Sequence, residues 1–271
     1  MPRGEPIPTL SGLRDIVRND PSKTGHKIPW ISQFVILPYV AIYFTKLFLH
    51  LRWCGDHVTL LMTACAFLGP ICFFIGGTRG YVIGACLMLL SWALDHADGQ
   101  VRRYRGEDSI FSIYLDRFTH RVSYPLQHLG MGVSLYGASG AAGDLLLGGA
   151  VAYAYQLVVV QTLDKQILQL ERGHVDPDPL RTLRLRLTAW MPALEWPLKL
   201  LVGGYSQLIQ NPTFVTLLII AALFDAVRPY YLAYSVVIMF NWLLRTLLDY
   251  TVVFPWRKRY APPYGSSASE S

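Results

Sequence analysis

The stretch from Asp95 to Arg121, DHADGQVRRYRGEDSIFSIYLDRFTHR, carries three aspartates and one histidine at spacings that could bring them together: Asp95, Asp98, Asp116 and His120. Asp95 and Asp98 are three residues apart, and Asp116 and His120 are four apart, so each pair shares one face if its segment is helical. Two such helices, packed antiparallel, would bring the four side chains into one pocket. Carboxylates gathered in this way favour bound cations, and oxygen-rich sites suit Mg²⁺ or Mn²⁺.

The chemistry expected of such a site is phosphoryl chemistry. Two cations bridged by shared carboxylates would suit the handling of phosphoryl oxygens, and Arg103 could neutralise further phosphate charge. The alternative interpretation is structural: the carboxylates lie solvated at helix ends or pair with Arg102, Arg103 and Arg117. For the whole set of acidic residues together with Gly99 and Arg103, we favour the cation site.

The elements that must position these residues are apolar. The chain has 271 residues, of which 52% are hydrophobic and 15% charged, whereas soluble domains average about 25% charged. Because a bilayer crossing needs about 20 apolar residues, the pattern predicts an all-α integral membrane protein with six transmembrane helices. The predicted spans are Val58–Gly77, Gly80–Leu94, Val122–Gly143, Leu145–Leu163, Leu200–Phe224 and Pro229–Leu244.

Two segments depart from the simple pattern of transmembrane spans. Pro212 interrupts the fifth block, so its helix is expected to begin near Asn211. The apolar segment Trp30–Leu51 could be a seventh span or an amphipathic helix in the headgroup region, and we favour the interfacial helix. The predicted units are a cytoplasmic N-terminus with the interfacial helix (1–53), a six-helix transmembrane catalytic domain (54–253) and a disordered cytoplasmic tail (254–271).

The distribution of basic residues predicts the orientation. Seven of the 24 Lys and Arg residues precede the first firm span, whereas the opposite side carries only Arg79 and Arg228. Because basic residues near span ends stay preferentially in the cytoplasm, both termini and the carboxylates are expected to face the cytoplasm. This basic excess suits anionic headgroups or phosphorylated substrates, and no nucleic-acid partner is expected.

The segment that carries the aspartates resembles the signature of the CDP-alcohol phosphotransferase family, DxxDGxxAR followed after eight or nine residues by GxxxDxxxD. Taking about one in twenty for each residue type, five fixed matches arise by accident in roughly one chain of this length in ten thousand. The positions that match at the expected spacing are Asp95, Asp98, Gly99, Arg103 and Asp116.

The resemblance implies a function. The enzyme would transfer a phosphoalcohol or phosphatidyl group from a CDP-linked donor, such as CDP-diacylglycerol, to an alcohol acceptor with release of CMP, in phospholipid or phosphodiester biosynthesis. It would use two Mg²⁺ or Mn²⁺ ions, held by Asp95, Asp98, Asp116 and His120, and would form a homodimer. The residues implied to contact nucleotide or phosphate are Thr59, Asp98, Gly99, Arg102, Arg103 and Ser112.

Three residues depart from the family signature. Arg102 replaces an alanine and is expected either to turn outward or to add a phosphate contact. Ser112 replaces the second glycine, which tightens any backbone approach to the nucleotide. His120 replaces the last aspartate, where the family implies a metal ligand or the general base. An imidazole suits either role, and we favour the base because its unperturbed pKa lies near 6.5.

Other charged residues have weaker interpretations. Arg121, Arg184 and Arg186 could hold an anionic acceptor group, and topological anchoring explains them equally well. Arg245 and Asp249, four residues apart in the last span, are expected to form an intrahelical pair.

Two other function classes stay open. An intramembrane prenyltransferase also uses Mg²⁺ and diphosphate, but two separate acidic motifs would be expected where the sequence has one compact cluster. A non-catalytic lipid- or metal-binding membrane protein, or a transporter, is the other alternative. Carriers more often bind their ions on broken helices near the bilayer midplane, whereas this cluster lies at a span end. Release of CMP, release of diphosphate and metal flux distinguish the three.

Overall fold

The structure is a computed structural model that describes residues 9–12, 36–172, 191, 205 and 209–253. In these residues every long element is a helix and no strand occurs, so the predicted all-α class is confirmed for them. The helices are α2 (Ile36–His50), α3 (Gly55–Ile75), α4 (Gly77–Arg105), α5 (Ile110–Ser139), α6 (Ala142–Arg172), α9 (Asn211–Leu223), α10 (Val227–Leu248) and the π-helix η3 (Asp249–Val253).

Among the helices that the structure describes, four are long and apolar enough to cross a membrane: α3, α4, α6 and α10. They indicate a multi-pass integral membrane protein. Helix α9 is apolar but has only 13 residues, which extend about 20 Å against a hydrocarbon core of about 30 Å. Helix α5 has 30 residues but is more polar. It contains Gln127 and His128, which are buried within the bundle.

The helix boundaries differ from the predicted spans at most of their ends, and α5 begins at Ile110 instead of Val122. Helix α4 does not end with its apolar block at Leu94 but continues to Arg105, so the first two aspartates lie on a helix. The predicted span Val122–Gly143 is wrong at its end, because Gly140 adopts a left-handed conformation (φ 69°) and caps α5 after Ser139. Helix α9 begins at Asn211, as predicted.

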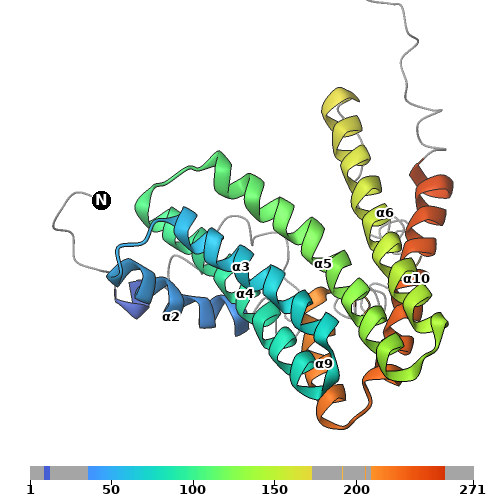
Figure 1. The fold of residues 1–271 in the computed structure, drawn as a ribbon. Coiled ribbons are helices and arrows are strands. Elements are labelled where there is room, and N and C mark those ends of the chain that lie inside the picture. Colours follow the sequence, from blue (N-terminus) through green and yellow to red (C-terminus); the bar gives the residue numbers. More distant parts are fainter. Residues whose placement is uncertain (1–8, 13–35, 173–190, 192–204, 206–208, 254–271) are drawn as a thin grey trace, which may run out of the picture.

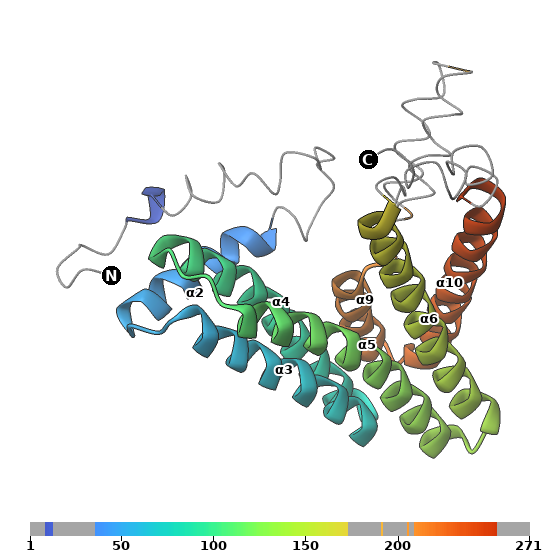
Figure 2. The ribbon, with the colours of Figure 1, turned by 90° about the horizontal axis from the view of Figure 1, so that it is seen from above.

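The helices form two groups that are joined by α5 (Figures 1 and 2). Helix α3 packs against both α4 and α5, and α2 packs against α4. Helix α5 then extends to α6, with which it forms a hairpin, and α6 packs against α10. Helix α9 contacts both α4 and α10 and so connects the two groups.

Helix α2 corresponds to the predicted interfacial segment. It has 15 residues, about 22 Å, which is too short to cross a bilayer alone. Its buried face includes Ala41 and Phe48, which pack with Ala97 of α4. The Thr45 hydroxyl donates a hydrogen bond of 2.8 Å to the Gln100 side chain, which fixes α2 beside the last turns of α4. The predicted tail, 254–271, lies outside the described residues.

An ion pair that was not predicted from the sequence joins the last span to α6. The expected partner of Asp249 was Arg245, but its carboxylate lies 2.5 Å from Lys165 Nζ of α6. Arg245 instead donates a hydrogen bond of 3.1 Å to Asn241. Because the Lys165 and Asp249 side chains are 12% and 10% exposed, this contact removes two charges from the bundle surface, and the predicted intrahelical pair is wrong.

Helices α5 and α6 cross with their backbones in contact. A Cβ atom on Gly148 would lie 2.7 Å from the Cα atom of Gly132, closer than van der Waals contact allows. A Cβ atom on the neighbouring Gly149 would have no atom within 4 Å. The two glycines therefore allow a close approach of α5 and α6.

Gly148→Ala is expected to destabilise the fold by about 1–3 kcal/mol, because the backbone of α5 would have to move away. Gly149→Ala is the matched control and should be neutral or stabilising by up to about 1 kcal/mol, since alanine favours helix. Denaturant titration in mixed micelles measures both free energies of unfolding. Equal effects of the two substitutions would contradict the close crossing.

Candidate metal site

Three of the predicted ligands converge between α4 and α5. Asp95 comes from α4, and Asp116 and His120 come from α5; one ligand atom from each lies within 4.8 Å of the others. His120 Nε2 is 3.1 Å from Asp116 Oδ1 and 3.7 Å from Asp95 Oδ1. All three side chains are partly exposed, at 23–30% of their surface, so an ion could reach them.

The donor set fits a divalent cation. Two carboxylates and one imidazole are a combination that Mg²⁺, Mn²⁺ and related ions accept. Asp116 Oδ1 is a buried oxygen without a hydrogen-bond donor among the described residues, and its near neighbour is the His120 imidazole. A buried acceptor of this kind carries a desolvation cost, which a bound cation would offset.

The two ring nitrogens of His120 have different neighbours. Nε2 faces the two carboxylates, whereas Nδ1 is 2.7 Å from the Tyr124 hydroxyl. Only Nε2 is therefore directed at the candidate site, and it can bind a metal or accept a proton but not both at once. The geometry favours the ligand role, and the base role stays a prediction.

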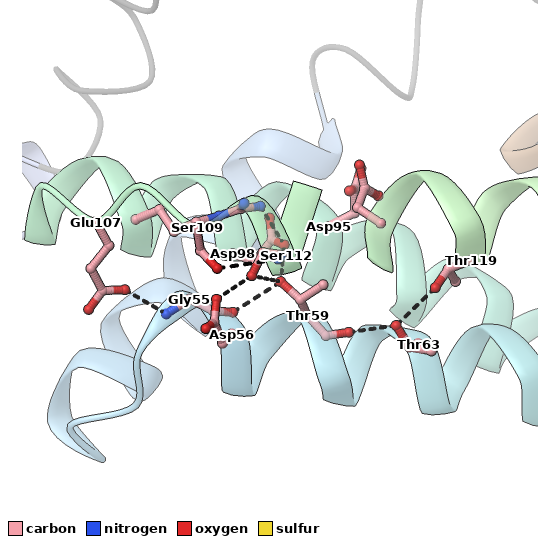
Figure 3. A network of polar contacts seen from close by, with 12 residues as sticks. Gly55, Asp56, Thr59, Thr63, Asp95, Asp98, Glu107, Ser109, Ser112 and Thr119 are labelled. Atoms are coloured by element: carbon pink, nitrogen blue, oxygen red, sulfur yellow. Dashed lines mark hydrogen bonds and ion pairs between the residues drawn. The ribbon is translucent and has the colours of Figure 1, made fainter. Parts of the chain in front are cut away.

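Asp98 is not part of this group. Its carboxylate is 1% exposed and accepts hydrogen bonds from the Thr59 hydroxyl at 2.6 Å and from the Arg102 guanidinium at 2.8 Å. Residues three apart on a helix differ by about 60° in direction. Asp98 therefore meets Thr59 of α3, whereas Asp95 lies beside His120 of α5. Figure 3 shows Asp98 within the contacts to α3 and Asp95 apart from them.

Arg102 does not turn outward. Its side chain turns back over the start of α3 and forms an ion pair with Asp98, and its phosphate contact stays a prediction. A Cβ atom on Gly55 would collide with the Arg102 Cγ, so the glycine leaves room for the arginine. The glycine at the start of the neighbouring helix thus provides the space that the bulky arginine side chain needs.

Ser112 and the loop before α5 attach that helix to the start of α3 (Figure 3). The fully buried Ser112 hydroxyl donates a short hydrogen bond to Asp56 and accepts one of 3.3 Å from Thr59. Glu107 accepts a hydrogen bond of 2.9 Å from the Gly55 N–H, which satisfies one of the free donors at a helix start and places negative charge there. These contacts fix the position of α5 along α3, and with it the position of Asp116 relative to Asp95.

The other predicted contact residues are more exposed. Gly99 is partly exposed, and within 4 Å a Cβ atom there would meet only the Arg103 guanidinium, so no neighbouring helix requires the glycine. Arg103 is exposed, and Arg121 is partly exposed while its carbonyl accepts a hydrogen bond from Gln156. Arg184 and Arg186 lie outside the described residues.

Sequence reasoning missed two residues that contact His120. Tyr124 bonds to its Nδ1 atom, and the Trp92 ring lies 5.4 Å from the imidazole between ring centroids. Tyr124 follows His120 by four residues, which places both on one helix face. That spacing was a usable signal, although aromatic residues at this spacing more often mark an apolar core.

Comparisons with known proteins add no assignment. No family model matches the chain, and no curated protein matches it significantly.

Arg102→Ala would leave the buried Asp98 carboxylate without its cation, and we expect the free energy of unfolding to fall by about 3–5 kcal/mol. The exposed Arg117 on α5 provides the control, since Arg117→Ala should change stability by less than about 0.5 kcal/mol. Unfolding in mixed micelles measures both variants. An Arg102→Ala protein as stable as the control would show that the ion pair does not secure α3 to α4.

Proposed function

We propose that this protein is an integral membrane, metal-dependent CDP-alcohol phosphotransferase. It would transfer a phosphoalcohol or phosphatidyl group from a CDP-linked donor to an alcohol and release CMP. The observation that carries the proposal is the convergence of Asp95, Asp116 and His120, because these residues occupy three positions of the family signature and together form a donor set for a divalent cation.

The residues around the cluster suit a diphosphate substrate. A bound divalent cation would neutralise the charge of the donor's diphosphate oxygens. Arg103, exposed on the same helix as Asp95, would contact phosphate, and the open surface at Gly99 would let the nucleotide approach α4. The site as a whole would act by positioning and charge neutralisation.

The proposed reaction is a displacement at phosphorus. The acceptor hydroxyl oxygen forms a bond to the phosphorus atom next to CMP, the bond from that atom to the bridging oxygen breaks, and CMP leaves with the electron pair. The hydroxyl proton passes to a basic group of the cluster. We assign His120 Nε2 as a metal ligand, because it lies between two carboxylates rather than facing open solvent; a carboxylate oxygen is then the acceptor for the proton.

The proposal includes a topology. Helices α3, α4, α5, α6 and α10 would cross the bilayer, and α9 would belong to the remaining predicted span. The basic residues near the span ends would place both termini and the metal site at the cytoplasmic face. The loop arginines Arg184 and Arg186, with Arg121, would face an anionic acceptor there, and the protein would act as a homodimer.

The structure provides little support for the other function classes. A prenyltransferase with two acidic motifs would present a second cluster, and the described residues contain one group able to hold a metal. A carrier would bind its ion on broken helices, whereas α4 is continuous from Gly77 to Arg105.

The first test is turnover. Purified protein with Mn²⁺ or Mg²⁺ should release CMP from CDP-diacylglycerol or a soluble CDP-alcohol when a panel of alcohols is supplied. Asp116→Asn should lower the rate at least about 100-fold through loss of electrostatic stabilisation, and Asp164→Asn, at an exposed position on α6, should not. Absence of CMP release across the panel, or equal rates for the two variants, would refute the proposal.

The second test separates the two roles of His120. If His120 is a ligand, His120→Ala should weaken Mn²⁺ binding at least about 10-fold, while His50→Ala, at an exposed position on α2, leaves it unchanged. Titration with Mn²⁺, followed by the paramagnetic resonance signal of the free ion, measures the affinity. Unchanged affinity with a rate lowered by about 10²–10⁴ would assign His120 as the general base instead.

A further inference from the structure

The contact between Tyr124 and His120 joins the candidate metal site to the interior of the bundle. The Tyr124 hydroxyl lies 2.7 Å from His120 Nδ1, on the side of the ring away from the carboxylates. An imidazole that binds a metal through Nε2 carries its proton on Nδ1, and that N–H needs an acceptor. The tyrosine oxygen is placed to be this acceptor.

Tyr124 is itself held in place from two sides. It is 6% exposed. The Trp92 ring of α4 is nearly parallel to it, at 6.2 Å between centroids and 5° between planes, and the Tyr155 ring of α6 meets it edge-on at 5.5 Å. Packing on both sides fixes the ring, so the hydroxyl cannot turn away from His120.

The hydroxyl has a specific purpose in this position. A phenylalanine would fill the same space between Trp92 and Tyr155 without burying a polar atom, and a buried hydroxyl is costly unless it is hydrogen-bonded. The hydroxyl forms its hydrogen bond with the His120 ring, four residues earlier on the same helix. The imidazole is therefore linked to a ring that is packed between α4 and α6.

We propose that Tyr124 is a positioning residue, which holds the His120 ring with Nε2 toward Asp95 and Asp116 and accepts a hydrogen bond from Nδ1–H when Nε2 binds a cation. The inference rests on the metal site of the proposed function. Tyr124 lies four residues beyond His120, which is the last residue of the signature segment, and on the same face of α5. It would be the hydrogen-bond partner of the histidine ligand.

Tyr124→Phe is the direct test, because it removes only the hydroxyl. We expect Mn²⁺ to bind the purified full-length protein about 10- to 100-fold more weakly, as is usual when the partner of a ligating histidine is lost. Tyr230→Phe is the matched control. The Tyr230 hydroxyl donates a hydrogen bond of the same 2.7 Å length to the Phe214 carbonyl, between α10 and α9, and its loss should leave Mn²⁺ binding unchanged.

A double-mutant cycle distinguishes positioning from a general effect on folding. If Tyr124 acts through His120, Tyr124→Phe should cause no further loss of Mn²⁺ affinity in a His120→Ala protein. A further loss of about 10-fold in that background would show that the hydroxyl acts through the fold and would overturn the inference.

The same titration separates failure of this inference from failure of the proposed function. Mn²⁺ affinity of Tyr124→Phe within twofold of the unsubstituted protein, with binding lost in Asp116→Asn, would overturn the role of Tyr124 and leave the metal site intact. Absence of saturable Mn²⁺ binding in the unsubstituted protein would overturn both.

Discussion

The structure depends on keeping two carboxylates of neighbouring helices close together inside an apolar bundle. Asp95 and Asp116 repel each other, and an ionised carboxylate within a membrane span costs about 2.5–3.5 kcal/mol. The imidazole of His120 lies within 4 Å of both and is the nearest group that can bridge them. A bound cation would offset the negative charge of both aspartates. This geometry therefore suits a metal-binding protein better than a helix bundle in which the cluster has only a structural role.

The polar residues of the signature segment divide into two sets with different physical roles. Asp98 and Arg102 form a nearly dry ion pair against Thr59, and with Ser112 they attach α4 and α5 to α3. The partly exposed residues on the other side of α4 remain available to a ligand. Burial decides between the roles: a carboxylate that is 1% exposed and already bonded by two donors serves the scaffold.

Much of this arrangement could be predicted from the sequence, and the part that could not depends on tertiary neighbours. Hydropathy predicted α3 and most of α4, and residue spacing brought together Asp95, Asp116 and His120. Spacing alone could not separate Asp98 from Asp95, because the two side chains differ in direction by only about 60° and their partners, Thr59 of α3 and His120 of α5, come from other helices. Hydropathy also missed the early start of α5 at Ile110, whose polar residues face the other helices.

If the cluster of Asp95, Asp116 and His120 binds a divalent cation, a bound Mn²⁺ ion must lie between these side chains. An anomalous-scattering map from crystals of the protein grown with Mn²⁺ would locate the ion. We expect a peak at coordination distance, about 2.0–2.3 Å, from oxygens of Asp95 and Asp116 and from His120 Nε2. A map without a peak between α4 and α5, or with Mn²⁺ bound only at other residues, would contradict it.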